Sequence, residues 1–74
     1  MESFEPKKLA LIRIWQILKD YSDYDHPLTQ EDIAVKLENE YGIVIERKAI
    51  SRNISLLKEA GVDIESRRAG SYLE

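Results

Sequence analysis

The strongest constraint on the fold is the spacing of the apolar residues, which follows a helical period through most of the chain and a strand period near its end. In the first part of the chain, apolar residues recur at intervals of three and four, at Leu11, Ile14, Trp15 and Leu18. This spacing predicts an α-helix from about Lys7 to Tyr21, with Pro6 in its first turn. Ile12 and Ile17 widen the apolar stripe, so we expect a heavily buried helix with Trp15 in the core.

A second helix is predicted from about Gln30 to Tyr41, after a polar loop that ends in Pro27. Thr29 precedes Asp32 by three residues, which is close to the spacing of a capping box. Gly42 follows the last apolar position and supplies a helix stop. The residues expected on the core face of this helix are Ile33, Ala34 and Leu37, with Tyr41 at its end.

A third helix is predicted to begin near Glu46 or Arg47 and to end at Gly61, which stands where a C-terminal glycine usually does. Its apolar residues recur at i, i+4 and i+7, at Ile50, Ile54 and Leu57. We expect Ala49 and Leu56 to extend the buried side. The preceding segment, 43–45, is too short for a helix and predicts a turn with an extended, buried stretch.

After Gly61 the apolar period changes from 3.6 to 2, which predicts a short, half-buried strand. Val62, Ile64 and Ser66 alternate there with Asp63, Glu65 and Arg67. The segment 68–71 then predicts a turn, and Tyr72-Leu73 begins a return strand. The predicted fold is therefore mainly α: a three-helix winged helix-turn-helix with a short C-terminal β-hairpin, the wing. Because the return strand has only just begun, we expect the wing to be truncated and the natural protein to continue.

A chain of 74 residues has room for one domain with a thin core, so we assign residues 1–74 to a single domain. The chain has no cysteine, which excludes disulfides and thiolate metal sites. No apolar run approaches the roughly 18 residues of a membrane span, and the acidic segment 1–6 lacks signal-peptide character. We therefore expect a cytoplasmic domain that does not bind membranes.

The net charge of −3 argues against a nucleic-acid partner, but the charges are unevenly distributed. Residues 19–46 carry eight acids and two bases, whereas residues 47–74 carry six bases and four acids. Local patches matter more than totals when a protein docks on phosphate. The basic residues near the C-terminal end therefore keep a nucleic-acid partner open.

The face of the third helix opposite its apolar stripe combines four cations with two small hydroxyls. These are Arg47, Lys48, Ser51, Arg52, Ser55 and Lys58. Most charged helix faces are simply solvated, and the pattern alone leaves that reading open. The short link between the second and third helices favours a helix-turn-helix, in which the start of the second helix meets base edges. Small residues between cations let such a helix enter the major groove, about 12 Å wide, where Arg bonds guanine O6 and N7.

Two other places could contact the DNA backbone. Arg67 and Arg68 lie near the tip of the predicted hairpin, although a soluble turn would carry the same residues. Thr29 and Gln30 open the second helix, whose N-terminus could bind a phosphate. The acids Glu31 and Asp32 beside them would oppose that role.

The sequence offers little for catalysis or metal binding. His26 is the only histidine and lies in a loop, so the chain has too few nitrogen and sulfur ligands for a metal site. Asp23, Asp25 and His26 lie close in sequence but lack an activated nucleophile. The three glycines are isolated, so there is no phosphate-binding loop. We predict no catalytic residue, no metal and no cofactor, and a protein that is not an enzyme.

The third helix and its exit resemble the recognition helix of DeoR-type winged helix-turn-helix regulators. Arg52-Asn53-Ile54 corresponds to their Arg-Asp-Leu run, with Asn in place of Asp, and Leu57 and Gly61 match the positions that follow. The chain is also similar to the N-terminal domain of bacterial regulators that carry a C-terminal WYL domain. That likeness rests on a long first helix, on Pro27-Leu28-Thr29 before the second helix and on Arg47-Lys48 at the start of the third.

This resemblance spans about residues 8–72. It implies a transcriptional regulator whose C-terminal ligand-sensing or dimerising part lies outside this sequence, and it allows a homodimer formed through that part. We therefore expect sequence-specific binding of double-stranded DNA. Arg47, Lys48, Ser51 and Arg52 would enter the major groove, Ser55 and Lys58 would line its wall, and Arg67 and Arg68 would touch backbone or minor groove. The alternative is a protein-interaction module that uses the acidic stretch from Asp20 to Glu46.

Overall fold

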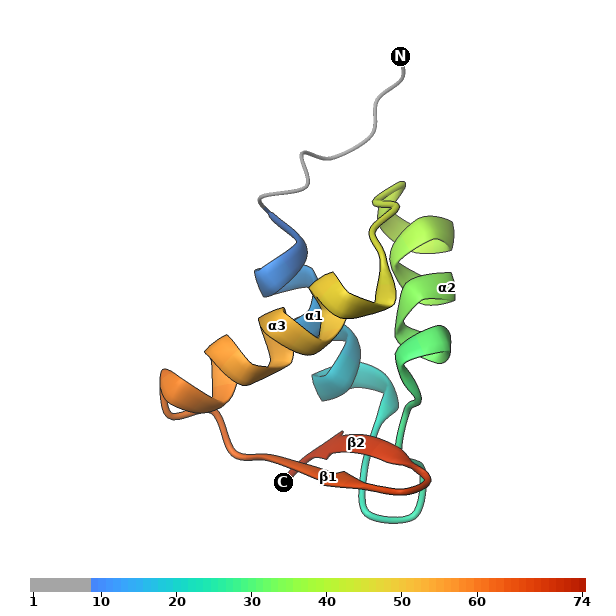
Figure 1. Cartoon of the computed structure of the whole chain (residues 1–74). Helices are drawn as coiled ribbons and strands as arrows, with labels where there is room; N and C mark the ends of the chain where they lie inside the picture. Colours follow the sequence, from blue (N-terminus) through green and yellow to red (C-terminus); the bar gives the residue numbers. More distant parts are fainter. Residues whose placement is uncertain (1–8) are drawn as a thin grey trace.

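The computed structural model describes residues 9–74 and has three helices followed by an antiparallel hairpin (Figure 1). The elements are α1 (Ala10–Tyr21), α2 (Gln30–Tyr41), α3 (Arg47–Glu59), β1 (Ile64–Arg67) and β2 (Gly70–Leu73). This confirms the predicted mainly α layout of a winged helix-turn-helix. α1 ends at Tyr21 as predicted, whereas its expected start at Lys7 and the role of Pro6 lie outside the described residues.

Local signals in the sequence define the ends of α2 and α3. The Thr29 hydroxyl accepts a hydrogen bond from the Asp32 amide at 3.0 Å, and the Asp32 carboxylate accepts one from the Thr29 amide at 3.0 Å, so the predicted capping box is present. Gly42 ends α2 in the left-handed conformation, with φ of 68°. At the end of α3, Gly61 has φ of 99° and the amides of Gly61 and Val62 bond back to the last turn. This is the Schellman arrangement, and it turns the chain toward the hairpin.

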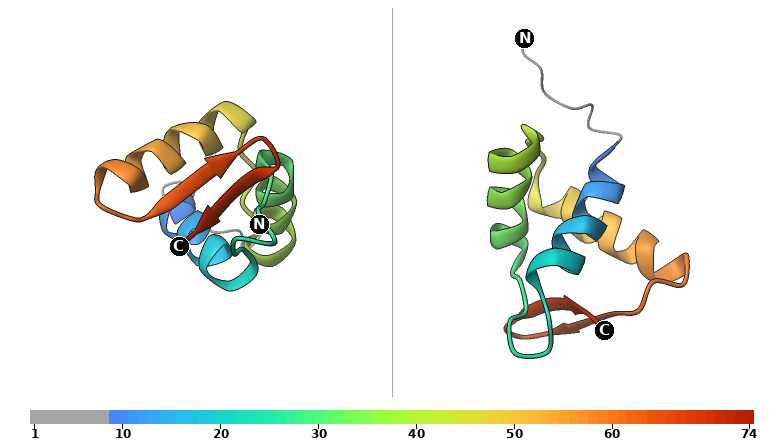
Figure 2. Two further views of the ribbon diagram at one scale, coloured as in Figure 1. Left: turned by 90° about the horizontal axis from the view of Figure 1, so that it is seen from below. Right: turned by 180° about the vertical axis from the view of Figure 1, so that it is seen from behind.

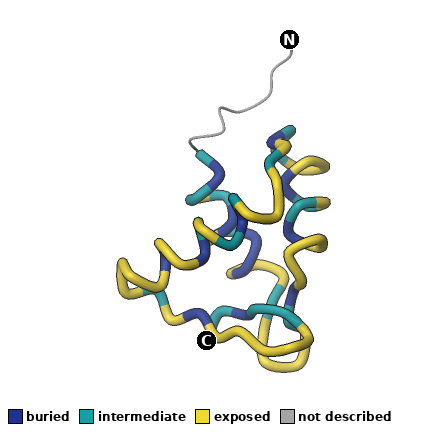
Figure 3. Tube along the Cα trace, in the orientation of Figure 1, coloured by how far each residue is buried: buried dark blue, intermediate teal, exposed yellow. Residues whose placement is uncertain are grey.

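The core lies where the three helices meet, with α1 packed against α2, α3 and β2 (Figure 3). Its fully buried side chains come from all three helices and from the α2–α3 link: Ile14, Ile17, Leu18, Ile33, Leu37, Ile43 and Ile50. The predicted core residues Ile54 and Leu57 are buried as well, while Ala34 and Tyr41 are only partly so. Of the α2–α3 link only Ile43 is fully buried, and Val44 is 61% exposed, so the expected buried stretch is shorter than predicted.

Three apolar residues that we expected on the buried side are exposed. Trp15 is 40% exposed because it lies about 100° around α1 from Ile14, at the edge of the buried arc. Ile12 lies still farther from that arc, so α1 is buried along one stripe only. Leu56 is 52% exposed because its neighbour Leu57 takes the core position, and consecutive helical residues point in different directions.

The hairpin lies across one end of the helices, beside the segment that joins α1 to α2 (Figure 2). β1 and β2 pair from Ile64 opposite Leu73 to Arg67 opposite Gly70, so the turn is Arg68-Ala69 and is shorter than predicted. Leu28 adds a further pairing that we did not predict, because its amide and carbonyl bond those of Ser71 at 2.7 and 2.8 Å. These two bonds hold the wing against the entrance to α2.

None of the helices in residues 9–74 has the length and apolar character needed to cross a membrane.

Candidate nucleic-acid interface

α3 turns its apolar stripe toward the core, and this fixes the direction of its basic residues. Ile50 and Ile54 are buried, whereas Lys48, Arg52 and Ser55 are exposed on the opposite side. Within residues 9–74, the side chains of Lys48 and Arg52 take part in no hydrogen bond or ion pair. Their charges are therefore available to an external anion or base edge.

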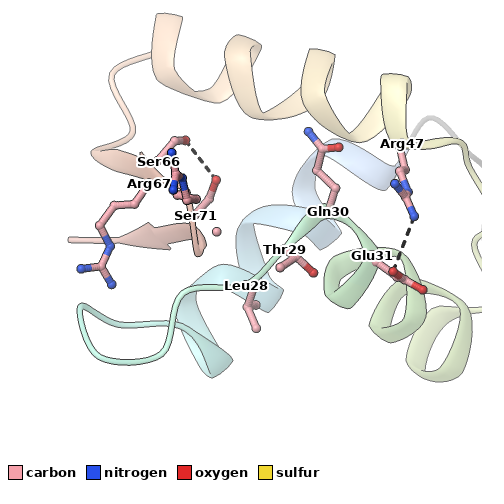
Figure 4. A pocket seen from close by; sticks show the side chains of 10 residues that line it. Leu28, Thr29, Gln30, Glu31, Arg47, Ser66, Arg67 and Ser71 are labelled. Atoms are coloured by element: carbon pink, nitrogen blue, oxygen red, sulfur yellow. Dashed lines mark hydrogen bonds and ion pairs between the residues drawn. The ribbon is translucent and has the colours of Figure 1, made fainter.

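A hollow of about 410 Å³ lies between the start of α2, the start of α3 and the hairpin (Figure 4). We call it the α2–wing hollow; its lining residues are Leu28, Thr29, Gln30, Glu31, Arg47, Ser66, Arg67, Arg68, Gly70 and Ser71. Half of the ten predicted contact residues meet here: Thr29, Gln30, Arg47, Arg67 and Arg68. The structure thus brings together cations from α3 and from the wing.

Two contacts join the first turn of α2 to the first turns of α3. Arg47 Nη2 lies 3.5 Å from Glu31 Oε1, and both side chains remain largely exposed, at 68% and 73%. Gln30 Nε2 donates a hydrogen bond to Ser51 Oγ. Gln30, predicted as a phosphate contact, therefore also holds a predicted base-contacting residue in position.

Lys58, which we expected along the groove wall, also bonds the wing. Lys58 Nζ donates to Ser66 Oγ at 3.1 Å, and Ser66 Oγ lies 3.0 Å from Ser71 Oγ. Lys58 thus links the end of α3 to both strands of the hairpin. The strand residue Ser66 was grouped with buried residues by its alternation, but it is exposed and faces this lysine.

The two wing arginines have different surroundings. Arg67 Nη2 donates to the Tyr24 carbonyl at 2.5 Å, and its guanidinium lies 4.6 Å from the Tyr24 ring centre and 5.2 Å from that of Tyr72. The two rings meet edge to face at 5.7 Å. Within the described chain, Arg68 at the hairpin turn has no such partner. Arg67 therefore fastens the wing to the α1–α2 loop, and Arg68 is left open to solvent.

Thr29 is occupied by the capping box through both its amide and its hydroxyl. The predicted phosphate site would therefore rely on the other first-turn amides of α2, which have no partner within a helix. Glu31 adds a negative charge to the same place. The structure thus puts the expected phosphate contact beside a carboxylate that already pairs with Arg47.

The other flank of α3 is more apolar than predicted. A hollow of about 540 Å³ runs along Ser51, Arg52 and Ser55 to Leu56, and a second of about 440 Å³ joins Arg52 to Val44. Arg52 lines both, so it stands between the polar side of α3 and the apolar flank formed by Val44 and Leu56.

Two groups of titratable residues lie away from this interface. His26 Nδ1 lies 2.9 Å from the Asp23 carboxylate, and that hydrogen bond lowers the pKa of Asp23 below its ordinary value. The pair closes the α1–α2 loop. Asp63, Glu65 and Glu74 lie together at the base of the hairpin, where the charge of Asp63 raises the pKa of Glu74. All three are exposed.

Sequence reasoning missed the residues that hold the interface together. Leu28, Gly70 and Ser71 join the wing to α2, and Glu31 joins α2 to α3. Only Gly70 carries a local signal, since a glycine in a turn often marks a backbone conformation that residues with a side chain disfavour, and its φ is 141°. The other contacts pair residues far apart in the chain, so the apolar periodicity of the sequence gives no sign of them.

Fold and site together describe a winged helix-turn-helix domain with a basic outer face on α3 and one free arginine on its wing. Comparisons of the chain with protein-family models, with curated proteins and with solved structures found no match.

Proposed function

We propose that this domain binds double-stranded DNA in a sequence-specific manner, with α3 in the major groove. The observation that carries the proposal is the α2–wing hollow, because Arg47 of α3 and Arg68 of the wing line the same surface. A duplex that met the start of α3 would therefore meet the wing tip too. In helix-turn-helix proteins the N-terminal residues of the second helix contact base edges in this way.

The contacts divide into base and backbone roles. Arg47, Lys48, Ser51 and Arg52 reach base edges, because they lie on the first two turns of α3. Arg68 approaches the sugar-phosphate backbone from the wing. Ser55 lies farther along the groove wall, Lys58 supports the wing, and Arg67 anchors it. Gln30 and the first amides of α2 lie beside the phosphate path.

We further propose that the domain is the DNA-reading part of a cytoplasmic transcriptional regulator. The support is the resemblance of Arg52-Asn53-Ile54, Leu57 and Gly61 to the recognition helix of DeoR-type proteins and of WYL-domain regulators. A regulator of that kind would sense its ligand, and form a dimer, through a C-terminal part. The isolated domain then binds weakly, since its net charge of −3 repels DNA.

The test is an NMR titration of the labelled domain with a mixed-sequence duplex at low and moderate salt. We expect amide shifts in residues 47–55 and around Arg68, which fade as salt rises because released counterions favour binding. The affinity should fall by about 0.9 log units per log unit of salt for each phosphate contacted. Shifts that are absent, or scattered over the surface, would contradict the proposal.

A second candidate is a protein-interaction module on the same scaffold. It is favoured by the exposed Leu56 on α3 and Val44 just before α3, because contacts with the DNA backbone do not need apolar residues. The salt dependence of binding distinguishes the two functions. Binding through an apolar flank depends weakly on salt, whereas binding through several phosphates depends on it steeply.

A further inference from the structure

Glu31 is the one carboxylate in the lining of the α2–wing hollow, and it faces a cation that the proposed function assigns to DNA. Its neighbour Asp32 is occupied, because the Asp32 carboxylate accepts the Thr29 amide in the capping box. Glu31 is not needed for the cap and instead reaches across to Arg47 of α3. Helix capping therefore does not explain why a glutamate stands at position 31.

The geometry leaves part of the Arg47 guanidinium free. The ion pair joins Nη2 to Glu31 Oε1, whereas a guanidinium carries five N–H donors arranged around its plane. Arg47 can thus keep its contact with Glu31 while another edge bonds a guanine. A phosphate that approached Arg47 within the hollow would also come close to the Glu31 carboxylate. The two negative charges would repel each other.

We propose that Glu31 is a specificity-determining residue: it competes with phosphate for Arg47 and so disfavours DNA that offers Arg47 only backbone contacts. This inference rests on the proposed DNA-binding function and adds to it the partner that sets the selectivity of Arg47. On a matching site Arg47 bonds a base and stays paired with Glu31. On DNA that offers Arg47 no matching base, Arg47 must either break its ion pair with Glu31 to bond a phosphate or make no contact with the DNA.

The test compares Glu31→Gln with Glu38→Gln in the full chain. Both residues are exposed glutamates on α2 and both variants remove one negative charge, but Glu38 lies near the other end of the helix and has no side-chain partner within the described residues. Fluorescence anisotropy would give the affinity of each variant for a mixed-sequence duplex over a range of salt. A duplex enriched from a random pool by the unmodified domain would give the affinity for a preferred site.

We expect Glu31→Gln to bind the mixed duplex about threefold more tightly than Glu38→Gln, which is the effect of two unit charges about 7 Å apart in water. Its salt slope should be steeper by about 0.9, since Arg47 gains one phosphate. The preference for the enriched duplex should fall by a similar factor. In an Arg47→Gln background the change in slope should disappear.

The outcomes separate this inference from the proposed function. If the unmodified domain shows no salt-dependent binding to any duplex, the DNA-binding proposal itself fails. If it binds, and Glu31→Gln behaves as Glu38→Gln does, Glu31 has no role in selectivity. If Glu31→Gln weakens binding to both duplexes, Glu31 orients Arg47 for all its contacts, and competition with phosphate is wrong.

Discussion

Replacing Gly70 by alanine should separate the wing from α2, because no side chain fits at this position. Gly70 has φ of 141°, and a Cβ placed on it would lie 2.6 Å from the carbonyl carbon and oxygen of Leu28 and 2.9 Å from the Thr29 amide nitrogen. These neighbours are backbone atoms, so they cannot rotate away as a side chain would. Relief requires the hairpin to move from Leu28.

The magnitude follows from what that movement breaks. Holding a residue with a Cβ in such a sparsely populated backbone region costs about 1–3 kcal/mol. The two hydrogen bonds between Leu28 and Ser71 contribute about 1 kcal/mol each to net stability. We therefore expect Gly70→Ala to lower the free energy of unfolding by roughly 3–5 kcal/mol. In a domain of this size each kcal/mol corresponds to about 4–8 °C in Tm.

Gly61→Ala is the matched control. Gly61 also has a positive φ, 99°, but a Cβ placed there would have nothing within 4 Å. It should therefore show the backbone strain alone, about 1–3 kcal/mol. The difference of about 2 kcal/mol between the two variants then measures the attachment of the wing.

Urea unfolding followed by circular dichroism would give both free energies, and hydrogen exchange would report on the two amides. In Gly70→Ala the amides of Leu28 and Ser71 should lose protection, while those in the middle of α2 keep theirs. Equal costs for the two variants, or unchanged protection of Leu28 and Ser71, would refute the reasoning.

Three further predictions test the interface and its support. Arg52→Ala should weaken binding to an enriched duplex by roughly 1–3 kcal/mol and relax the preference at one base pair. If fluorescence anisotropy shows the affinity and the base preference unchanged, Arg52 does not read a base. Thr29→Ala should lower the free energy of unfolding by about 1 kcal/mol through loss of the Asp32 amide bond, while Thr29→Ser keeps the cap, and equal urea midpoints for the two would count against it. Asp23→Asn tests the loop: because the pKa of Asp23 is lowered from 3.8, its stabilising effect is present above about that pH and is lost as pH falls through the folded-state pKa. The difference in urea midpoint between Asp23→Asn and the unmodified domain should thus be present at pH 5 and vanish near pH 2, and a difference that grew on acidification would have the wrong sign.

The features that the sequence predicted well are those set by neighbours along the chain. The bounds of α2 were predicted to the residue because Thr29, Asp32 and Gly42 act within one turn of its ends. The end of α3 at Gly61 and the later change of period were predicted for the same reason. The order of three helices and a hairpin followed from these local signals.

Burial was less predictable, because apolar periodicity shows which side of a helix is apolar but not how much of that side the other elements cover. A core this small covers only part of each helix, so Trp15 at the edge of the α1 stripe remains partly exposed. Leu56 and Leu57 are alike in sequence, and only the packing of α3 against the other elements decides which of them is buried. The apolar flank beside Arg52 is a consequence that periodicity could not show.

The two wing arginines show why the candidate site could not be predicted fully without the fold. Arg67 and Arg68 are adjacent and chemically identical, and sequence reasoning gave them one role. Arg67 is the last residue of β1, and its guanidinium meets the carbonyl and ring of Tyr24, 43 positions earlier in the chain. Arg68 follows in the turn and carries its charge free of partners within residues 9–74. In the DNA-binding function that we propose, the two residues would contribute in different ways, because a charge at the tip of the wing helps only if the tip is held in place. Arg67 fixes the wing, and Arg68 is the charge that the wing presents.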